Sequence, residues 1–268
     1  MIDDTKVAVA KQLQYKYENE DYTAREVEWR EVAGKHKAAN ILTVCKDHEF
    51  QRVLECGAGD GSILHHLNNA KAFQELYAIE ISEKAINQIK SRNLSCLRDL
   101  RKFNGYEIPY ADKQFDMAYC SHVIEHVEHP RLLLRELKRV SEYQVFEVPL
   151  DYMIGVDCKV EHFLSYGHIN IFTPSLFKFL LKSEGFAIVN ELHSHLANDV
   201  LRYNWYRNLN MKKTITRELR IRSYPLIRFL KKILFGSSRF LEYECQQYTC
   251  LAKGADEIRI STNGTVDN

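Results

Sequence analysis

The chain has 268 residues, of which 45% are hydrophobic and 27% are charged, and its formal net charge is +1. This composition is typical of a globular protein with a full core, and the near-neutral charge does not indicate any class of partner. No apolar run approaches the roughly 20 residues of a membrane-spanning helix. Residues 1–21 lack the basic head and apolar block of a signal peptide, so we expect a cytoplasmic protein.

Cysteine usage argues against two kinds of structural site. The seven cysteines are odd in number and scattered, and no two of them form a C-x-x-C pair. This pattern disfavours a disulfide framework and a zinc knuckle. We expect most of the cysteines to be small core residues.

The first part of the chain is expected to be helical. Strands and helices are expected to alternate from residue 51 onward. Residues 1–50 are mixed in charge with apolar residues at helical spacing, which predicts a helical lid or docking segment. Short apolar runs at 52–56, 76–81, 115–120 and 144–149 then alternate with helical stretches at 62–70, 82–92 and 122–140. This alternation predicts an α/β fold, a doubly wound and mostly parallel sheet with helices on both faces.

The remaining residues are expected to complete one domain over 51–253. Thr173 is a candidate N-cap for a helix over 173–186, with Pro174 in its first turn, and a strand follows at 187–192. Residues 202–241 form a basic helical insert before a last strand over 243–253. Residues 254–268 are polar and are expected to be a flexible tail.

The stretch VLECGAGDGS, residues 53–62, places three glycines at alternate positions behind an apolar run. Glycine permits positive φ and close ligand approach, and the N–H groups at a helix start can face the ligand. A tight turn without a ligand is the alternative. A phosphate loop is excluded because no lysine follows Gly61, and the dinucleotide fingerprint fails because Ser62 stands where its third glycine belongs. Glu80, at the tip of the second strand, suits the ribose of either a dinucleotide or an adenosyl ligand.

An ordered set of motifs then resembles a known family. VLECGAGDGS, YAIEIS, IPYADKQFDMAYCSHVIEHVEHPRLLLRELKRV and GHINIFTPSLFKFLLKSEGF are similar to motifs of the class I S-adenosylmethionine-dependent methyltransferases, in the branch of quinone and sugar methyltransferases. The resemblance implies a Rossmann-like fold and S-adenosylmethionine as cofactor. It also implies the cofactor-binding residues Glu55, Gly57, Ala58, Gly59, Gly61, Glu80, Ile81, Asp99, Leu100, Ser121 and His122.

Histidines are the candidate catalytic residues because a neutral imidazole can take the proton of an acceptor hydroxyl. His122 follows the fourth strand, and His162 and His168 lie in the long segment after the fifth strand, with Asp151 and Tyr152 as candidate substrate ligands. The alternative for His168 is a structural role at the turn before residues 169–174. His122 and His126 would share one face of the predicted helix, but no H-E-x-x-H pattern or third ligand is evident, so no metal is expected.

The basic insert carries eleven Lys/Arg residues between Arg202 and Arg239 and one acid, Glu218. Its amphipathic stretch indicates a peripheral membrane contact, a lid that reaches a substrate phosphate, or a solvated helix face. No nucleic-acid partner is expected.

The predicted function is methyl transfer to an oxygen, less often a nitrogen, of a small metabolite such as a sugar on a phosphate-bearing carrier. A non-catalytic methyltransferase-like binding subunit is the main alternative, and a nicotinamide oxidoreductase is the third.

Overall fold

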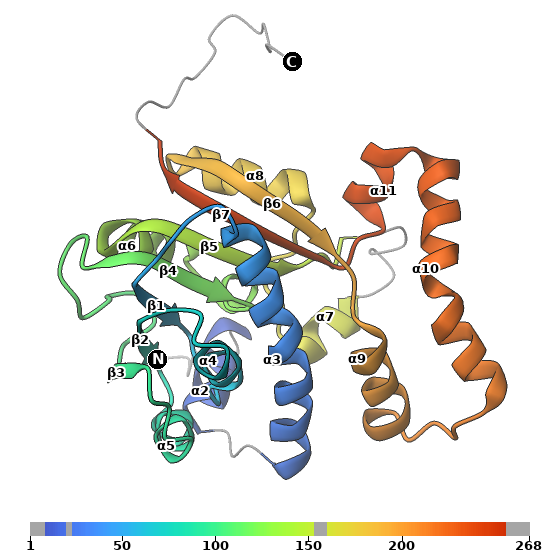
Figure 1. The fold of residues 1–268 in the computed structure, drawn as a ribbon, viewed down its shortest axis with the longest axis horizontal. Helices are drawn as coiled ribbons and strands as arrows, with labels where there is room; N and C mark the ends of the chain where they lie inside the picture. Colours follow the sequence, from blue (N-terminus) through green and yellow to red (C-terminus); the bar gives the residue numbers. More distant parts are fainter. Residues whose placement is uncertain (1–8, 20–22, 153–159, 256–268) are drawn as a thin grey trace, which may run out of the picture.

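The structure is a computed structural model, and it describes residues 9–19, 23–152 and 160–255. A seven-stranded sheet forms its centre, with strand order β3-β2-β1-β4-β5-β7-β6 (Figure 1). Strands β1 to β5 are parallel, whereas β7 runs antiparallel to both of its neighbours. The strands are β1 Arg52–Cys56, β2 Glu75–Glu80, β3 Leu97–Lys102, β4 Phe115–Ser121, β5 Ser141–Pro149, β6 Phe186–Ser194 and β7 Gln247–Gly254.

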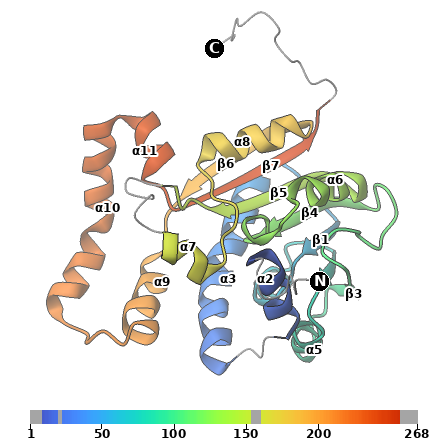
Figure 2. The same cartoon turned by 180° about the vertical axis from the view of Figure 1, so that it is seen from behind.

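Helices cover both faces of this sheet (Figures 1 and 2). Helices α3, α4 and α5 pack on one face, and α6 and α8 pack on the other. Helices α9, α10 and α11 form an insert between β6 and β7, as predicted. The helices are α2 Val9–Asn19, α3 Ala24–Cys45, α4 Ser62–Asn69, α5 Glu83–Ser91, α6 Pro130–Val140, α7 Val160–Tyr166, α8 Pro174–Ser183, α9 Asn198–Tyr203, α10 Ile215–Phe235 and α11 Ser237–Tyr243, with a 3₁₀ turn at Ile124–His126 and a π-helical turn at Asn204–Asn208.

Apolar side chains at helical spacing explain how the helices attach. Helix α6 buries one stripe completely, formed by Leu133, Leu134, Leu137 and Val140. Helix α3 likewise contributes Ala38 and Ile41 to the core on the opposite face. The N-terminal segment therefore packs as part of the sheet's cover from α3 onward.

The structure differs from the expectation at two elements. The predicted helix over 122–140 is broken, because Pro130 disfavours helical geometry at His129 and itself begins α6. His122 and His126 consequently do not share a helix face. Strand β3 was not predicted, since it lies at the sheet edge and its sequence LRDLRK contains no fully buried residue. The expected tail beyond residue 255 lies outside the described residues.

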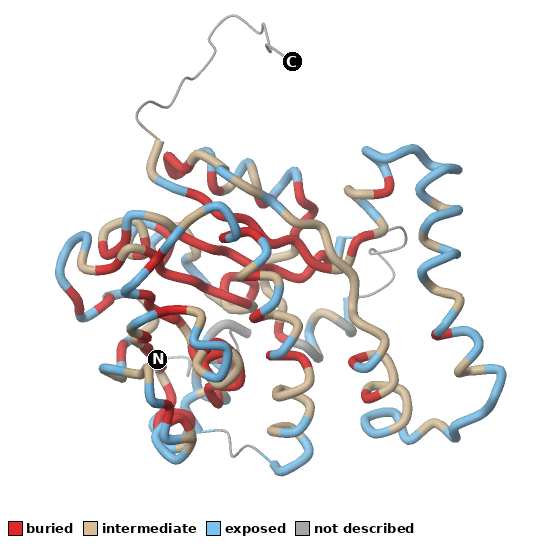
Figure 3. The backbone as a smooth tube through the Cα atoms, in the orientation of Figure 1, coloured by how far each residue is buried: buried red, intermediate tan, exposed pale blue. Residues whose placement is uncertain are grey.

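Helix α10 stands apart from the sheet. Figure 3 shows most of it exposed and the rest partly buried, and Ile221 is its one buried residue. Although α10 is 21 residues long, no described helix is both long and apolar enough to span a membrane.

The contact between α3 and α4 depends on Gly34. A Cβ atom there would lie 2.8 Å from Ser62 Cβ and 3.1 Å from the Ser62 carbonyl carbon. We predict that Gly34→Ala lowers stability, because an overpacking cost of about 1–3 kcal/mol exceeds a helix-propensity gain of about 1 kcal/mol. Thermal unfolding should show a lower Tm, whereas Lys35→Ala, at an exposed site of the same helix, should change it little. An unchanged or higher Tm for Gly34→Ala would contradict this close packing.

Candidate functional site

The glycine loop lies where β1 ends, beside the point at which the strand order reverses between β1 and β4. Gly57, Gly59 and Gly61 have φ values of 74°, 54° and 78°, in the left-handed region. A Cβ at Gly57 would meet Val123 Cγ2 at 2.5 Å, whereas one at Gly59 would have only Arg30 Nη1 nearby, at 3.4 Å. The loop is therefore packed beneath Gly57 and open above Gly59, which suits a ligand lying against Gly59.

Glu80 ends β2 and is 5% exposed. Its Oε2 accepts the Gly59 N–H at 2.8 Å, and its Oε1 accepts the N–H groups of Ile81 at 2.8 Å and Ser82 at 3.1 Å. Burial raises the pKa of Glu80, and the three backbone donors oppose that rise. A carboxylate has about four acceptor positions, so one remains for a donor group of a ligand.

The start of α4 differs from the expectation that its N–H groups face a ligand. The Ser62 N–H donates to Asp60 Oδ1 at 3.2 Å, and Asp60 in turn accepts from Arg92 Nη2 at 2.9 Å. The Gly57 and Ala58 N–H groups donate to the Ile79 carbonyl. These bonds make the loop rigid, and the ligand surface is left mainly to Glu80 and the open side of Gly59.

Glu55 in β1 is buried and accepts a hydrogen bond from the Tyr119 hydroxyl at 2.7 Å. Burial raises the pKa of Glu55 well above its usual value. Two cations on α3 enter the same region: Arg30 lies over Gly59, and the half-buried Lys37 lies close enough to Glu147, Glu125 and Glu55 to interact with their charges. Burial lowers the pKa of Lys37, and these carboxylates oppose that effect. Sequence reasoning missed both cations because they lie upstream of the recognised motifs.

The end of β4 is held by a buried carboxylate. Glu147 in β5 accepts from Ser121 Oγ at 2.5 Å, Asn40 Nδ2 at 2.7 Å and Thr249 Oγ1 at 3.2 Å. His122 follows Ser121 in the chain. It has φ 56°, which is uncommon for a residue with a side chain. Its N–H donates to the Glu147 carbonyl at 2.9 Å, and this bond helps to hold the strained conformation.

Three side chains after β4 and β5 form a compact cluster. Potential ligand atoms of Glu125, His126 and His168 all lie within 4.8 Å of one another. His168 Nδ1 lies 2.5 Å from Asp151 Oδ2, and His126 Nδ1 lies 2.9 Å from the Gly167 carbonyl. This Glu–His–His cluster joins residues that are 43 positions apart in the chain, so no local spacing pattern could predict it.

Charges within the cluster shift its pKa values in different directions. Burial raises the pKa of Glu125, but the close imidazole of His122 and the charge of His126 bring it down to about 2. Burial lowers the pKa of His126. Burial also lowers the pKa of His168, but the hydrogen bond and charge of Asp151 outweigh it and leave that pKa raised.

Two other predicted site residues, Asp99 and Leu100, lie on β3. Asp99 pairs with Tyr77 inside the sheet, three residues before the end of β3, so it lies about 10 Å from the level of Glu80. It is bound to Arg101 and Tyr110, and Leu100 packs on the core. The structure thus does not bring Asp99 to the cofactor edge.

The residues predicted on the acceptor side also differ in where they lie. Asp151 meets His168, as described, whereas Tyr152 is 44% exposed. His162 falls on α7, but its side chain is outside the described part of the structure.

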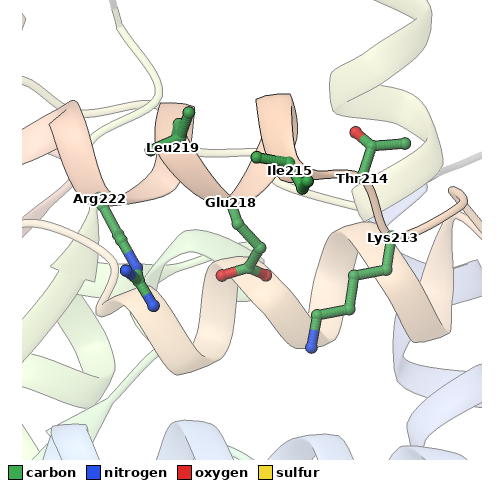
Figure 4. Close-up of a pocket in the computed structure, with 6 residues that line it drawn as sticks. All are labelled: Lys213, Thr214, Ile215, Glu218, Leu219 and Arg222. Atoms are coloured by element: carbon green, nitrogen blue, oxygen red, sulfur yellow. The ribbon is translucent and has the colours of Figure 1, made fainter.

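Two surface hollows, each of about 340 Å³, differ in their relation to these residues. One adjoins the cluster and has an apolar lining of Val160, Phe163, Leu164, Ile169 and Ile171 beside His168. The other lies at the start of α10, away from the strand ends, where Lys213, Glu218 and Arg222 point to one side (Figure 4). The first is the candidate acceptor site because only it includes a cluster residue.

Comparison with known proteins identifies the domain. A family model described as "Methyltransferase domain" matches residues 54–143, from β1 into β5. The Bacillus subtilis (strain 168) protein named "Putative methyltransferase YrhH" is 27% identical over 111 residues, covering 41% of this chain and 59% of YrhH. The chain spans about three fifths of the length of the curated relatives that it matches.

Solved structures agree on the fold. Geranyl diphosphate C-methyltransferase from Streptomyces coelicolor A3(2), solved with Mg²⁺, geranyl diphosphate and S-adenosyl-L-homocysteine, has a TM-score of 0.59 at 13% identity, covering 92% of this chain and 98% of that one. The [4+2]-cyclase SpnF has a TM-score of 0.54 at 15% identity, covering 82% and 80%. These likenesses confirm the predicted fold class. Over residues 54–143, the family match supports the class I S-adenosylmethionine-dependent methyltransferase family and the cofactor S-adenosylmethionine that the sequence predicts.

Proposed function

We propose that the protein transfers the methyl group of S-adenosylmethionine to an oxygen, less often a nitrogen, of a small acceptor. The observation that carries this proposal is the adjacency of two sites at one sheet edge. The glycine loop and Glu80 form a cofactor crevice, and the Glu–His–His cluster lies after the neighbouring strands β4 and β5. A non-catalytic binding subunit would need the crevice but not the cluster.

The crevice residues suit the parts of the cofactor. Glu80 has an acceptor position for a ribose hydroxyl, and the open side of Gly59 gives room for the chain that leads to the sulfur. Arg30 and Lys37 are cations that can pair with the cofactor's carboxylate. Glu55 and Asp60 are buried acids that suit its ammonium and sulfonium charges.

The cluster residues suit activation of an acceptor hydroxyl. When bound, S-adenosylmethionine supplies a methyl group on a positively charged sulfur, so alignment of the acceptor is the main task of the protein. In the transfer, the acceptor oxygen forms a bond to the methyl carbon as the carbon–sulfur bond breaks, and the hydroxyl proton passes to a histidine ring. His168 and His122 are the described candidates for its acceptance. S-adenosylhomocysteine is the second product.

The acceptor proposed is an amphiphilic metabolite. The hollow beside His168 has an apolar lining, which favours an apolar tail, and the basic insert favours a phosphate or diphosphate on the same molecule. A sugar on a lipid diphosphate carrier meets both requirements and provides hydroxyl groups.

Helix α2 is proposed to act as the lid over the acceptor side, with 51–253 as the catalytic domain. A Cβ at Gly167 would lie 2.2 Å from Leu13 Cδ2, and the Tyr17 hydroxyl lies 3.3 Å from His126 Nδ1. These contacts support the lid role, because they join α2 to His126 and to the residue before His168. A cytoplasmic location is proposed because the six described cysteines are all free.

Helix α10 is proposed to bind an anionic membrane surface. Leu226, Phe229, Leu230, Ile233 and Leu234 are between 55% and 77% exposed, and arginines and lysines alternate with them. An exposed apolar face beside basic residues is the pattern of helices that lie in the membrane interface. This location would bring the enzyme to a lipid-linked acceptor.

The first prediction concerns the cofactor. Glu80→Gln should weaken binding of S-adenosylhomocysteine about 10- to 100-fold, because it removes a charged acceptor of about 1.5–3 kcal/mol. Isothermal titration calorimetry measures this affinity directly. Glu83→Gln, an exposed change three residues away, should retain the original affinity. Equal affinities in the two variants would refute the role of Glu80.

The second prediction concerns the acceptor. His168→Asn should reduce transfer of a labelled methyl group from S-adenosylmethionine to extracted polar lipids and metabolites by roughly 10²- to 10⁴-fold. Affinity for S-adenosylhomocysteine should stay near the original value, because His168 lies on the acceptor side. His129→Asn, an exposed histidine outside the cluster, is the control. Full transfer by His168→Asn would show that this ring takes no part.

The third prediction concerns the membrane. The protein should sediment with vesicles that contain phosphatidylserine, but not with phosphatidylcholine alone, and high salt should release it. Phe229→Ser combined with Ile233→Ser should abolish sedimentation, whereas the matched pair Leu176→Ser and Phe179→Ser on α8 should not. Absence of binding at low salt would exclude a membrane role and leave α10 to a protein partner.

A further inference from the structure

Glu125 is a buried carboxylate that lacks ordinary partners. The residue is 0% exposed, and neither Oε1 nor Oε2 has a hydrogen-bond partner among the described residues. His122 Nδ1 lies 3.3 Å from Oε1, a close approach of charges without hydrogen-bond geometry. Because an unsatisfied buried acceptor is costly, a carboxylate in this position calls for a missing ligand.

Two histidines bring a ring nitrogen within 4.8 Å of a Glu125 oxygen. His126 Nδ1 bonds the Gly167 carbonyl at 2.9 Å, and His168 Nδ1 bonds Asp151 Oδ2 at 2.5 Å. The Tyr17 hydroxyl lies nearly equally far from both nitrogens of His126, at 3.3 and 3.4 Å, so the Gly167 bond determines the ring's orientation. Each histidine therefore donates Nδ1–H to an oxygen, which leaves Nε2 in the form that binds a metal.

We infer that Glu125, His126 and His168 bind a divalent transition-metal ion such as Zn²⁺. Histidine rings held at Nδ1 by a carboxylate and by a backbone carbonyl are the outer partners usual around metal-binding histidines. Two histidines and one glutamate form a catalytic zinc set that keeps a fourth position open. Nitrogen ligands favour Zn²⁺ and its neighbours over Mg²⁺, which prefers oxygen.

The spacing of the three ligand atoms is compatible with this ion. His126 Nε2 lies 3.9 Å from Glu125 Oε1, and the set lies within 4.8 Å. In a tetrahedral site, two metal–ligand bonds of about 2.1 Å place the ligand atoms about 3.4 Å apart, so closure requires the most distant atoms to approach by about 1.4 Å. Glu125 and Asp151 provide two negative charges, which offset the nearby ammonium of Lys37.

The open position would receive the acceptor's oxygen. Because His168 as a ligand has no nitrogen left to accept a proton, His122 would then take the hydroxyl proton. A bound divalent ion lowers the pKa of an attached hydroxyl, which would assist methyl transfer at that oxygen. This last step depends on the proposed function, but metal binding itself does not. The sequence predicts no metal because His122 and His126 have neither an H-E-x-x-H pattern nor a nearby third ligand. The fold instead joins His126 to Glu125 and His168.

The test uses untagged full-length protein freed of metal by a chelator. Titration with Zn²⁺ by calorimetry should show one ion bound per chain, and Co²⁺ should produce the visible absorption of a low-symmetry nitrogen–oxygen site. Glu125→Gln and His168→Asn should abolish both signals. Asp151→Asn should weaken Zn²⁺ binding about 10- to 100-fold, because it removes only an outer partner.

Controls show whether a lost signal comes from the loss of this site or from a variant that does not fold. His129→Asn should bind Zn²⁺ like the unchanged protein, and metal-free circular dichroism melts show whether each variant is folded. If the Glu125 variant does not fold, Asp151→Asn, at a more exposed position, still decides the matter. Lack of saturable binding, or binding that survives both Asp151→Asn and His168→Asn, would overturn the site. Neither readout requires S-adenosylmethionine, so failure of methyl transfer would not affect the result.

Discussion

The buried carboxylate of Glu147 connects four elements at the edge of the sheet that carries the site. From β5 it accepts hydrogen bonds from Asn40 on α3, Ser121 on β4 and Thr249 on β7. A buried charge requires several such partners, so these elements cannot separate without a large cost. The bond to Asn40 fixes the position of α3, and α3 brings Arg30 and Lys37 over the crevice. Cofactor and acceptor sides therefore depend on the same carboxylate.

The features that depend on local geometry could be predicted from local patterns in the sequence. Three alternating glycines require positive φ, and the structure has it at all three positions. The central strands are continuous apolar runs because helices bury both faces, so they could be recognised without tertiary information. Strand β3 lies at an edge and keeps polar residues, so its sequence lacks that signal. The family, the fold and the cofactor could be predicted for this reason, whereas β3 and the break at Pro130 could not.

The acceptor side could be predicted only in part. His168, His122 and Asp151 were selected because they follow strand ends, and the fold brings His168 to Asp151. Glu125 gave no signal, because a glutamate in a charged segment normally faces solvent. Its burial follows from the short 3₁₀ turn that replaces the expected helix, and His168, which completes the cluster, comes from a loop 43 positions later. Such a cluster depends on topology, and no spacing rule contains it.

The fold alone does not identify the reaction, because a cyclase and a C-methyltransferase share this architecture. Groups that make the fold less stable are more informative about function. His122 holds a left-handed backbone, at a cost of about 1–3 kcal/mol, and Glu125 lacks partners at a similar cost. Glu55 and Lys37 are also kept where burial opposes their charges. Because all four lie around one crevice and the adjoining cluster, their combined cost is best explained by a bound ligand that satisfies them. A domain used only as a binding scaffold would need the crevice groups Glu55 and Lys37, but not His122 and Glu125.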